Sequence, residues 1–234
     1  MKVLFVVADI YFSEPLGIMI LSAVCKKAGH NTRLAVVAHD DLEQVLDDFR
    51  PDVVAYSTMT SDENSFAYAN DIAIAWSKDR DHPVKRIMGG PHPTYFPEVM
   101  NKLNLDAICA GDGERAIIRI LDAVKEGGDM SGIANVTTPN APMGPKEVVE
   151  DMDEIPWADR DVFYDAAPEM KDHGISSISS MTSFGPIGAF GVVTLGMPDI
   201  SPPSLTVSNI LMIARSPSPA QIASKFSLFI TSGK

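Results

Sequence analysis

Three apolar runs of the chain end in short stretches that are rich in glycine or hydroxyl residues. Gly17 follows the first run, a serine and threonine stretch from Ser57 to Ser61 follows the second, and Gly89-Gly90 follows the third. Glycine lets the backbone approach a ligand where any Cβ would collide, and hydroxyls hydrogen-bond to polar groups of a ligand. These stretches therefore indicate a pocket for a flat ligand.

The candidate binding residues belong to these stretches and to the turn after a later apolar run. They are Glu14, Pro15, Leu16, Gly17, Ser57, Thr58, Met59, Thr60, Gly89, Gly90, Pro91, His92, Gly111, Gly113 and Glu114. Ordinary structural roles stay open for several of them, since Gly-Gly-Pro also forms simple turns, serine caps loops, and acidic residues favour helix N-termini. His92 lies between two prolines and is either a pocket residue or a residue that braces its loop.

Several common chemistries lack their motifs in this chain. The loop before Gly17 contains neither G-x-G-x-x-G nor G-x-x-x-x-G-K-[ST], so dinucleotide and P-loop binding lose their main support. Cys25 and Cys109 are the only cysteines, and each lies in an apolar stretch that is typical of core packing. No second ligand at a suitable spacing accompanies His92, so a metal site is not indicated.

The apolar runs alternate with helical patterns through the first 130 residues. Helices are indicated by apolar residues at core spacing, as along 63–79, and by a start at Pro15 and a stop at Gly29. Strands are expected at 3–8, 32–37, 52–57, 85–88 and 106–110, and a further short strand is indicated at 133–137, after these five. This order implies right-handed crossovers, so we expect an α/β fold with a flavodoxin-like (Rossmann-type) doubly wound five-stranded parallel sheet. Ligands of such sheets bind beyond the carboxyl ends of the strands, where the candidate loops must meet.

Composition and charge limit the class of protein. The 234 residues carry 19 basic and 31 acidic side chains, and the net charge of -12 disfavours nucleic acid and membranes as partners. No signal peptide is evident and no stretch reaches about 20 uninterrupted apolar residues, so we expect a cytoplasmic protein. We expect a domain at 1–130, a linker at 131–173, and an irregular Ser- and Pro-rich extension at 174–234.

Taken in order, the candidate stretches resemble the cobalamin-binding domain of cobalamin-dependent radical S-adenosylmethionine enzymes. Cobalamin domains carry D-x-H-x-x-G, S-x-L and G-G after strands one, three and four, and Gly17, Ser57 and Gly89-Gly90 stand in those places at similar intervals. The resemblance implies that the nucleotide tail of cobalamin threads between sheet and helices, where glycines admit it and a serine hydrogen-bonds to it. It rests on Pro15-Leu16-Gly17, Gly29-His30, Pro51-Asp52, Ser57-x-Met59, Gly89 to Thr94 and Gly111-Asp112-Gly113-Glu114.

One position departs from the motif of the resembled family. Aligning D-x-H-x-x-G on Gly17 places Phe12 at the aspartate and Glu14 at the histidine. A carboxylate suits the soft cobalt centre less well than an imidazole does. We therefore expect cobalamin to bind without a histidine ligand, as is common in the radical subgroup, with Glu14 near the cobalt.

The resemblance continues to Asp153–Asp161, which is similar to the linker that precedes the radical barrel of these enzymes. The barrel begins with C-x-x-x-C-x-x-C, whose thiolates hold a four-iron cluster, but this chain has Met181 to Gly188 there and no cysteine after Cys109. We therefore expect no iron–sulfur cluster in this chain. Our hypothesis is a truncated or frame-shifted member whose residues from about 184 onward are unrelated to the barrel, and the other reading frames of the DNA test it.

Three functions stay open on this evidence. The leading interpretation is a cobalamin-binding carrier, sensor or light-responsive module without independent catalysis. The alternative is a fragment or subunit of a cobalamin-dependent radical S-adenosylmethionine methyltransferase or cyclase, for which a protein partner would supply the cluster. The second alternative is another flavodoxin-like binding module, although the first loop lacks the acidic cluster of a phosphoacceptor site and a hydroxyl-rich phosphate cradle.

Overall fold

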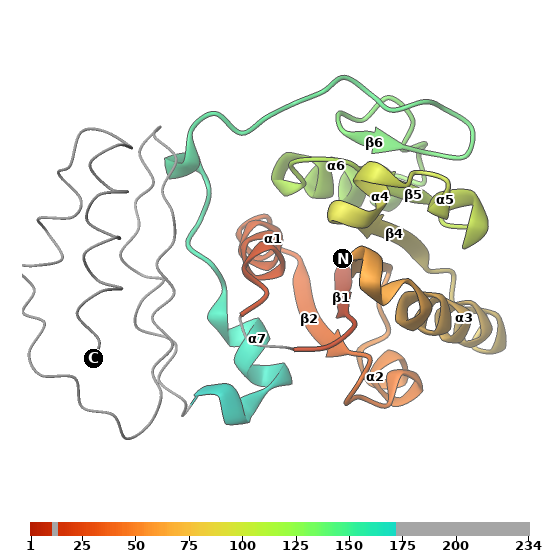
Figure 1. Ribbon diagram of the computed structural model, residues 1–234, viewed down its shortest axis with the longest axis vertical. Helices are drawn as coiled ribbons and strands as arrows, with labels where there is room; N and C mark the ends of the chain where they lie inside the picture. The colour runs from red at the N-terminus through yellow and green to blue at the C-terminus, as the bar shows by residue number, and fades with distance from the viewer. Residues whose placement is uncertain (11–13, 172–234) are drawn as a thin grey trace, which may run out of the picture. The chain divides into compact units, whose positions relative to one another are not determined.

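The computed structural model describes residues 1–10 and 14–171 (Figure 1). The chain divides into two units, Met1–Ile187 and Gly188–Lys234, and all described residues belong to the first. The expectations for Phe12 and for the extension at 174–234 lie outside the described residues.

A sheet with the strand order β2-β1-β3-β4-β5-β6 forms the centre of this unit. The first five strands in the chain pair in parallel, which confirms the predicted flavodoxin-like doubly wound fold. A sixth short strand, within the stretch 133–137 where the sequence indicates one, adds an antiparallel edge to the sheet. The strands are β1 (Lys2–Val7), β2 (Asn31–Val36), β3 (Val53–Ser57), β4 (Lys85–Gly89), β5 (Ala107–Cys109) and β6 (Val136–Thr137).

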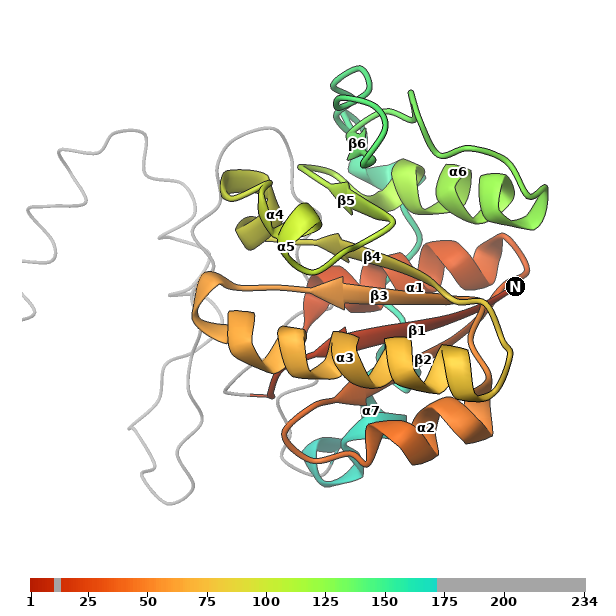
Figure 2. The ribbon, with the colours of Figure 1, turned by 90° about the vertical axis from the view of Figure 1, so that its right-hand side faces the viewer.

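Helices cover both faces of the sheet (Figures 1 and 2). The helices are α1 (Leu16–Lys27), α2 (Leu42–Phe49), α3 (Glu63–Asp79), α4 (Pro91–Tyr95), α5 (Val99–Lys102), α6 (Glu114–Lys125) and α7 (Arg160–Ala166), with short 3-10 turns η1 (Thr60–Asp62), η2 (Met152–Glu154) and η3 (Pro168–Lys171). Residues of α1, α6 and α7 pack together on one face, and residues of α2, α3 and α5 pack on the other. Within the described ranges, no helix is long and apolar enough to cross a bilayer.

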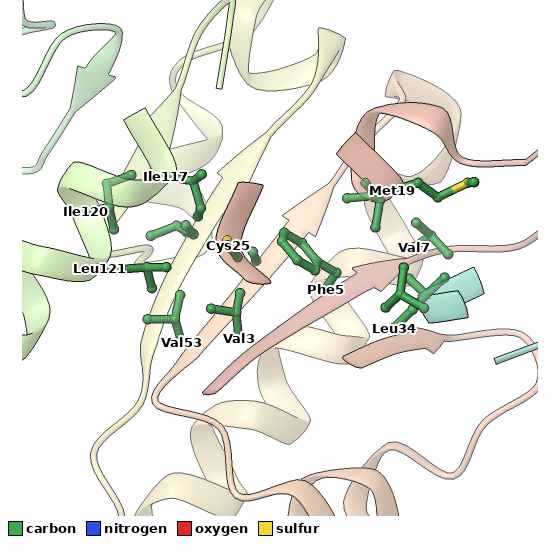
Figure 3. Packing of buried hydrophobic residues seen from close by; sticks show 14 of the residues in the cluster. Val3, Phe5, Val7, Met19, Cys25, Leu34, Val53, Ile117, Ile120 and Leu121 are labelled. Atoms are coloured by element: carbon green, nitrogen blue, oxygen red, sulfur yellow. The ribbon is translucent and has the colours of Figure 1, made fainter. Parts of the chain in front are cut away.

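Strand β1 shows why these residues form a central strand. Val3 and Phe5 point into the cluster beneath α1 and α6 (Figure 3). Leu4 and Val6 belong to the cluster beneath α2 and α3 on the other face. All four side chains are buried. Burying each such side chain is worth about 1.5–3 kcal/mol, so an unbroken apolar run is stable only with layers on both faces.

The segment expected as a linker contributes to this unit as far as the structure describes it. Strand β6 pairs with β5, and Val162 and Phe163 of α7 lie in the same buried cluster as Phe5 and Leu34. In Figure 1, α7 lies beside β2 and α1. Residues beyond 130 therefore help to build the face of the sheet that carries α1 and α6.

Candidate functional site

The candidate loops meet at the carboxyl edge of the sheet. In Figure 2 the arrows of β1, β3 and β4 point the same way, and α4 lies at the end to which they point. The chain leaves β1 towards β2 on one side, while β3 pairs with β1 on the other side. This arrangement is the topological switch point at which doubly wound sheets bind ligands.

Ser57 and Gly89 lie side by side at this edge, because they are register partners at the ends of β3 and β4. Side chains alternate along a strand, and Ala55 and Ile87 point into the cluster beneath α1 and α6, so Ser57 points to that same face. The Ser57 hydroxyl has no hydrogen bond to any residue that the structure describes. It is therefore available to a ligand lying between the sheet and these helices.

The space around two of the candidate glycines is open. A Cβ built on Gly17, in the first turn of α1, would have no atom within 4 Å, and one built on Gly89 would meet only the carbonyl oxygen of Cys109 at 3.9 Å. Neither position has a positive φ. The protein's own packing therefore does not explain these two glycines, whereas room for a ligand does.

Glu114 supplies an unsatisfied polar group at the same edge. Its Oε2 atom is buried and has no hydrogen-bond partner in the part of the chain that the structure describes. Its charge helps to raise the pKa of Cys109, which neighbours Gly89 across the sheet, although burial of the thiol is the larger cause. An orphaned buried acceptor at the start of a helix is a group that a ligand donor can satisfy.

The two remaining glycines of the turn after β5 differ from each other. A Cβ on Gly113 would lie 3.4 Å from the Leu21 side chain, so this glycine lets α6 start close to α1. Gly111 has a φ of +97° and no atom within 4 Å of a built Cβ. The backbone conformation alone explains why this residue is a glycine.

Gly90 and Thr58 form a backbone contact that needs no ligand. Gly90 has a φ of +98°, and a Cβ there would lie 2.8 Å from the Thr58 carbonyl oxygen. The Thr58 amide and hydroxyl each donate a 3.0 Å hydrogen bond to the Gly89 carbonyl, and the amide of His92 donates to the Thr58 carbonyl. At Gly90 the missing side chain therefore makes room for the chain's own backbone and not for a ligand. Pro91 then starts α4.

His92 is buried beneath this contact. Its ring stacks on Phe96 with a centroid distance of 5.4 Å, and its Nδ1 lies 3.4 Å from the Thr60 hydroxyl. Its Nε2 lies 4.0 Å from Glu63 and has no hydrogen bond in the described chain. Of the two roles that the sequence left open, these contacts favour bracing of the loop.

Apolar side chains stand exposed beside the open face. Leu16 and Met59 are 48% and 57% exposed, and Tyr95 and Phe96 at the end of α4 are also exposed. Singly exposed apolar residues are common, but several at one edge of a sheet suit the face of a broad, largely apolar ligand.

Glu14 is held by two residues that the sequence did not single out. Its carboxylate accepts a hydrogen bond from the Tyr164 hydroxyl and lies close to the Arg160 guanidinium, both in α7. The sequence signal for Arg160 was only its place in the stretch resembling a linker. The expectation that Glu14 lies near the cobalt stays a prediction.

The cysteines and the acidic groups do not form a metal centre in the described ranges. Burial raises the pKa of Cys25 to about 12 and that of Cys109 to about 11. Both thiols therefore stay protonated at neutral pH, as expected for core residues. A cavity of about 380 Å³, lined by Lys85, Asn104 and Asp106 among others, lies at the opposite edge of the sheet and shares no residue with the candidate loops.

Residues 4–121, half of the chain, match the family model of the B12 binding domain. The chain belongs to the B12-binding domain family. Its cofactor is cobalamin. This match confirms the family resemblance that the loop motifs indicated, and it disfavours an unrelated flavodoxin-like module.

Two curated relatives of this B12-binding chain are named as methylating enzymes. It is 28% identical over 185 residues to an uncharacterized methyltransferase of Pyrococcus horikoshii, covering 73% of this chain and 38% of the relative. It is 25% identical over 149 residues to the hopanoid C-3 methylase of Methylococcus capsulatus, covering 60% of this chain and 28% of the relative. The chain thus spans about a third of the length of these relatives.

Solved structures share the fold of the B12-binding unit. The cobalamin-dependent S-adenosylmethionine radical enzyme OxsB, with aqua-cobalamin and S-adenosylmethionine bound, gives a TM-score of 0.63 at 16% identity, covering 71% of this chain and 25% of that chain. The radical S-adenosylmethionine methyltransferase TsrM from Kitasatospora setae gives 0.52 at 16% identity, covering 62% and 30%. At these identities the likeness establishes the common fold.

Proposed function

We propose that this chain is the cobalamin-binding portion of a cobalamin-dependent radical S-adenosylmethionine methyltransferase. The observation that carries the proposal is the match to the Pyrococcus horikoshii methyltransferase, which covers 73% of this chain, whereas the family model covers half. The similarity therefore includes residues outside the B12-binding domain. A separate carrier or sensor, the interpretation that the sequence favoured, has less support because both curated relatives are named as methylating enzymes.

The open face between the sheet and the helices α1 and α6 fits the nucleotide tail of cobalamin. The space over Gly17 and Gly89 would admit the tail, and the Ser57 hydroxyl is free to hydrogen-bond to it. The buried Oε2 of Glu114 would accept a hydrogen bond that the described chain does not provide. These residues would hold the cofactor and set its depth in the pocket.

The exposed residues Leu16 and Met59 would lie against the corrin ring and shield it from water. The bracing of Thr58 by Gly90 and His92 would keep that surface rigid when the cofactor enters. Bound cobalamin supplies a cobalt centre that can accept and donate a methyl group. The protein's part in this account is to orient that centre towards a partner that supplies the iron–sulfur cluster.

Isotope transfer tests the proposal. The full chain is loaded with hydroxocobalamin, reduced, and given S-adenosylmethionine carrying ¹³C in its methyl group, with the iron–sulfur-reconstituted remainder of the Pyrococcus horikoshii enzyme as partner. We expect label in the protein-bound corrin and an equal amount of S-adenosylhomocysteine, because the methyl group leaves the sulfonium. The Gly89→Leu variant, with a filled pocket, serves as the control without label.

Tight cobalamin binding without label above the partner-free mixture would contradict the methyltransferase proposal and leave cofactor binding intact. A change in oligomeric state on illumination of the cobalamin-loaded chain would instead support the light-responsive alternative.

A further inference from the structure

Two side chains of α7 hold Glu14 at the entrance to α1. The Tyr164 hydroxyl donates a 3.0 Å hydrogen bond to Glu14 Oε1, and Arg160 Nε lies 3.6 Å from Glu14 Oε2. The Glu14 side chain is only 10% exposed, so solvent screens these interactions weakly. A residue of the first cofactor loop is thus fixed by a residue 150 positions later.

Helix α7 is itself anchored along α1. The Asp159 amide donates a 3.0 Å hydrogen bond to the Met19 carbonyl, and Asp159 Oδ2 accepts a 2.5 Å hydrogen bond from the Ser22 hydroxyl and pairs with Lys26 at 2.7 Å. Phe163 is fully buried in the same cluster. Helix α7 is therefore a rigid support from which side chains reach the β1–α1 loop.

The contacts of Glu14 bear on what this carboxylate can do. Turning it towards a metal would break its interactions with Tyr164 and Arg160. Arg160 Nε is buried and makes no hydrogen bond in the described part of the chain. Loss of the nearby carboxylate would leave its charge without compensation at that site, which is costly. The Glu14 carboxylate is therefore better suited to fixing the loop than to coordinating a metal.

We propose that Arg160 and Tyr164 are positioning residues of the cobalamin site. Through Glu14 they fix the start of α1 and so the position of Gly17, which borders the open face. Cofactor affinity then depends on α7, which lies beyond the matched family domain at 4–121. The proposal rests on cobalamin as the cofactor and is independent of methyl transfer.

The test is a double-mutant cycle in the full chain with Tyr164→Phe, Glu14→Leu, which leaves no acceptor for the Tyr164 hydroxyl, and the two combined. Hydroxocobalamin is titrated by absorbance, and the visible circular dichroism of the bound corrin is recorded. We expect each single change to raise Kd by roughly three- to tenfold, the effect of one modest hydrogen bond, and the pair to raise it no further than the larger single change. The corrin circular dichroism should change in all three variants.

Lys26→Ala is the matched control, because it removes one half-exposed ion pair of α7, leaves the hydrogen bonds of Asp159 to Met19 and Ser22 in place, and does not touch Glu14. It should leave Kd and the corrin spectrum at wild-type values, and denaturant unfolding of each apo-protein confirms that every variant is folded. Wild-type Kd and circular dichroism in Tyr164→Phe would overturn the proposal. Additive effects of the two changes, or an equal rise of Kd in Lys26→Ala, would also overturn it. A shifted absorption spectrum in Glu14→Leu alone would assign Glu14 to the cobalt instead.

Discussion

At the amino edge of the sheet, charged side chains pair with each other and with backbone groups, whereas at the carboxyl edge two polar groups, the Ser57 hydroxyl and Glu114 Oε2, have no hydrogen-bond partner in the described chain. Asp106 accepts hydrogen bonds from Lys85 Nζ and from the Arg86 amide, each at 2.9 Å. The Ser57 hydroxyl and Glu114 Oε2, at the other edge, have no such partner. The amino edge thus carries satisfied charged groups, and the carboxyl edge carries two unsatisfied polar ones.

The difference separates stability from binding. Groups that are paired within the protein stabilise the fold, while polar groups left open are available to a ligand at a cost in stability. Substitutions at the amino edge should therefore change unfolding and spare cobalamin, and substitutions on the open face should do the reverse.

Gly89→Leu should have the largest effect on binding. The new side chain would enter open space, since a Cβ meets only the Cys109 carbonyl at 3.9 Å, so the apo-protein should keep its stability within about 0.5 kcal/mol. Filling the pocket should raise the Kd for hydroxocobalamin roughly 5- to 150-fold, the range that overpacking of 1–3 kcal/mol produces. An unchanged Kd in an absorbance titration would place the tail elsewhere.

Gly90→Ala should instead reduce stability, although Gly90 is the sequence neighbour of Gly89. Its φ of +98° and its contact with the Thr58 backbone predict a loss of about 1–3 kcal/mol in denaturant unfolding. Gly111→Ala is the matched control, because Gly111 has a φ of +97° and no atom near a built Cβ. Equal losses in the two variants would mean that the Thr58 contact contributes nothing.

Acid should lower the free energy of unfolding by a smaller amount, through an ion pair at the amino-edge side of the unit. Hydrogen bonds from Arg80, and then from Trp76, lower the pKa of Asp47 from 3.8 to about 2. A lowered pKa in the folded state means that the stabilisation is present above pH 3.8 and is lost as the pH falls towards 2. The difference in the free energy of unfolding between wild type and Asp47→Asn should therefore shrink below pH 4. A difference that stays constant from pH 7 to pH 2 would exclude this ion pair as its source.

Much of the fold could be predicted because its signals are local. The helix predicted at 63–79 has the bounds of α3, and Gly29, predicted as a helix stop, has a φ of +83° just after α1. Gly17, Ser57 and Gly89 could be predicted as a group because each follows a parallel strand, and such strands end at one edge. Local sequence was sufficient to predict those helices and strands whose positions follow from the spacing of apolar residues.

The rest depends on contacts between residues far apart in the sequence. Nothing near Gly90 indicates that the Thr58 backbone occupies the space beside it, so the two adjacent glycines looked equivalent. Likewise, no local pattern pairs Glu14 with Tyr164. The sequence indicated a strand that includes β6, but its antiparallel pairing with β5 at the edge of the sheet is a contact between separate segments and could not be predicted.

The most direct test of the two-edge account compares Gly17→Leu with Asp106→Ala in hydroxocobalamin titration and in denaturant unfolding of the apo-protein. Gly17→Leu should be at least as stable as wild type, because glycine in a helix costs about 0.5–1 kcal/mol and a built Cβ meets no atom within 4 Å. It should also bind cobalamin more weakly than wild type. Asp106→Ala should unfold more easily and keep the wild-type Kd. Wild-type affinity in Gly17→Leu, or weakened affinity in Asp106→Ala, would contradict the separation of binding and stability between the two edges.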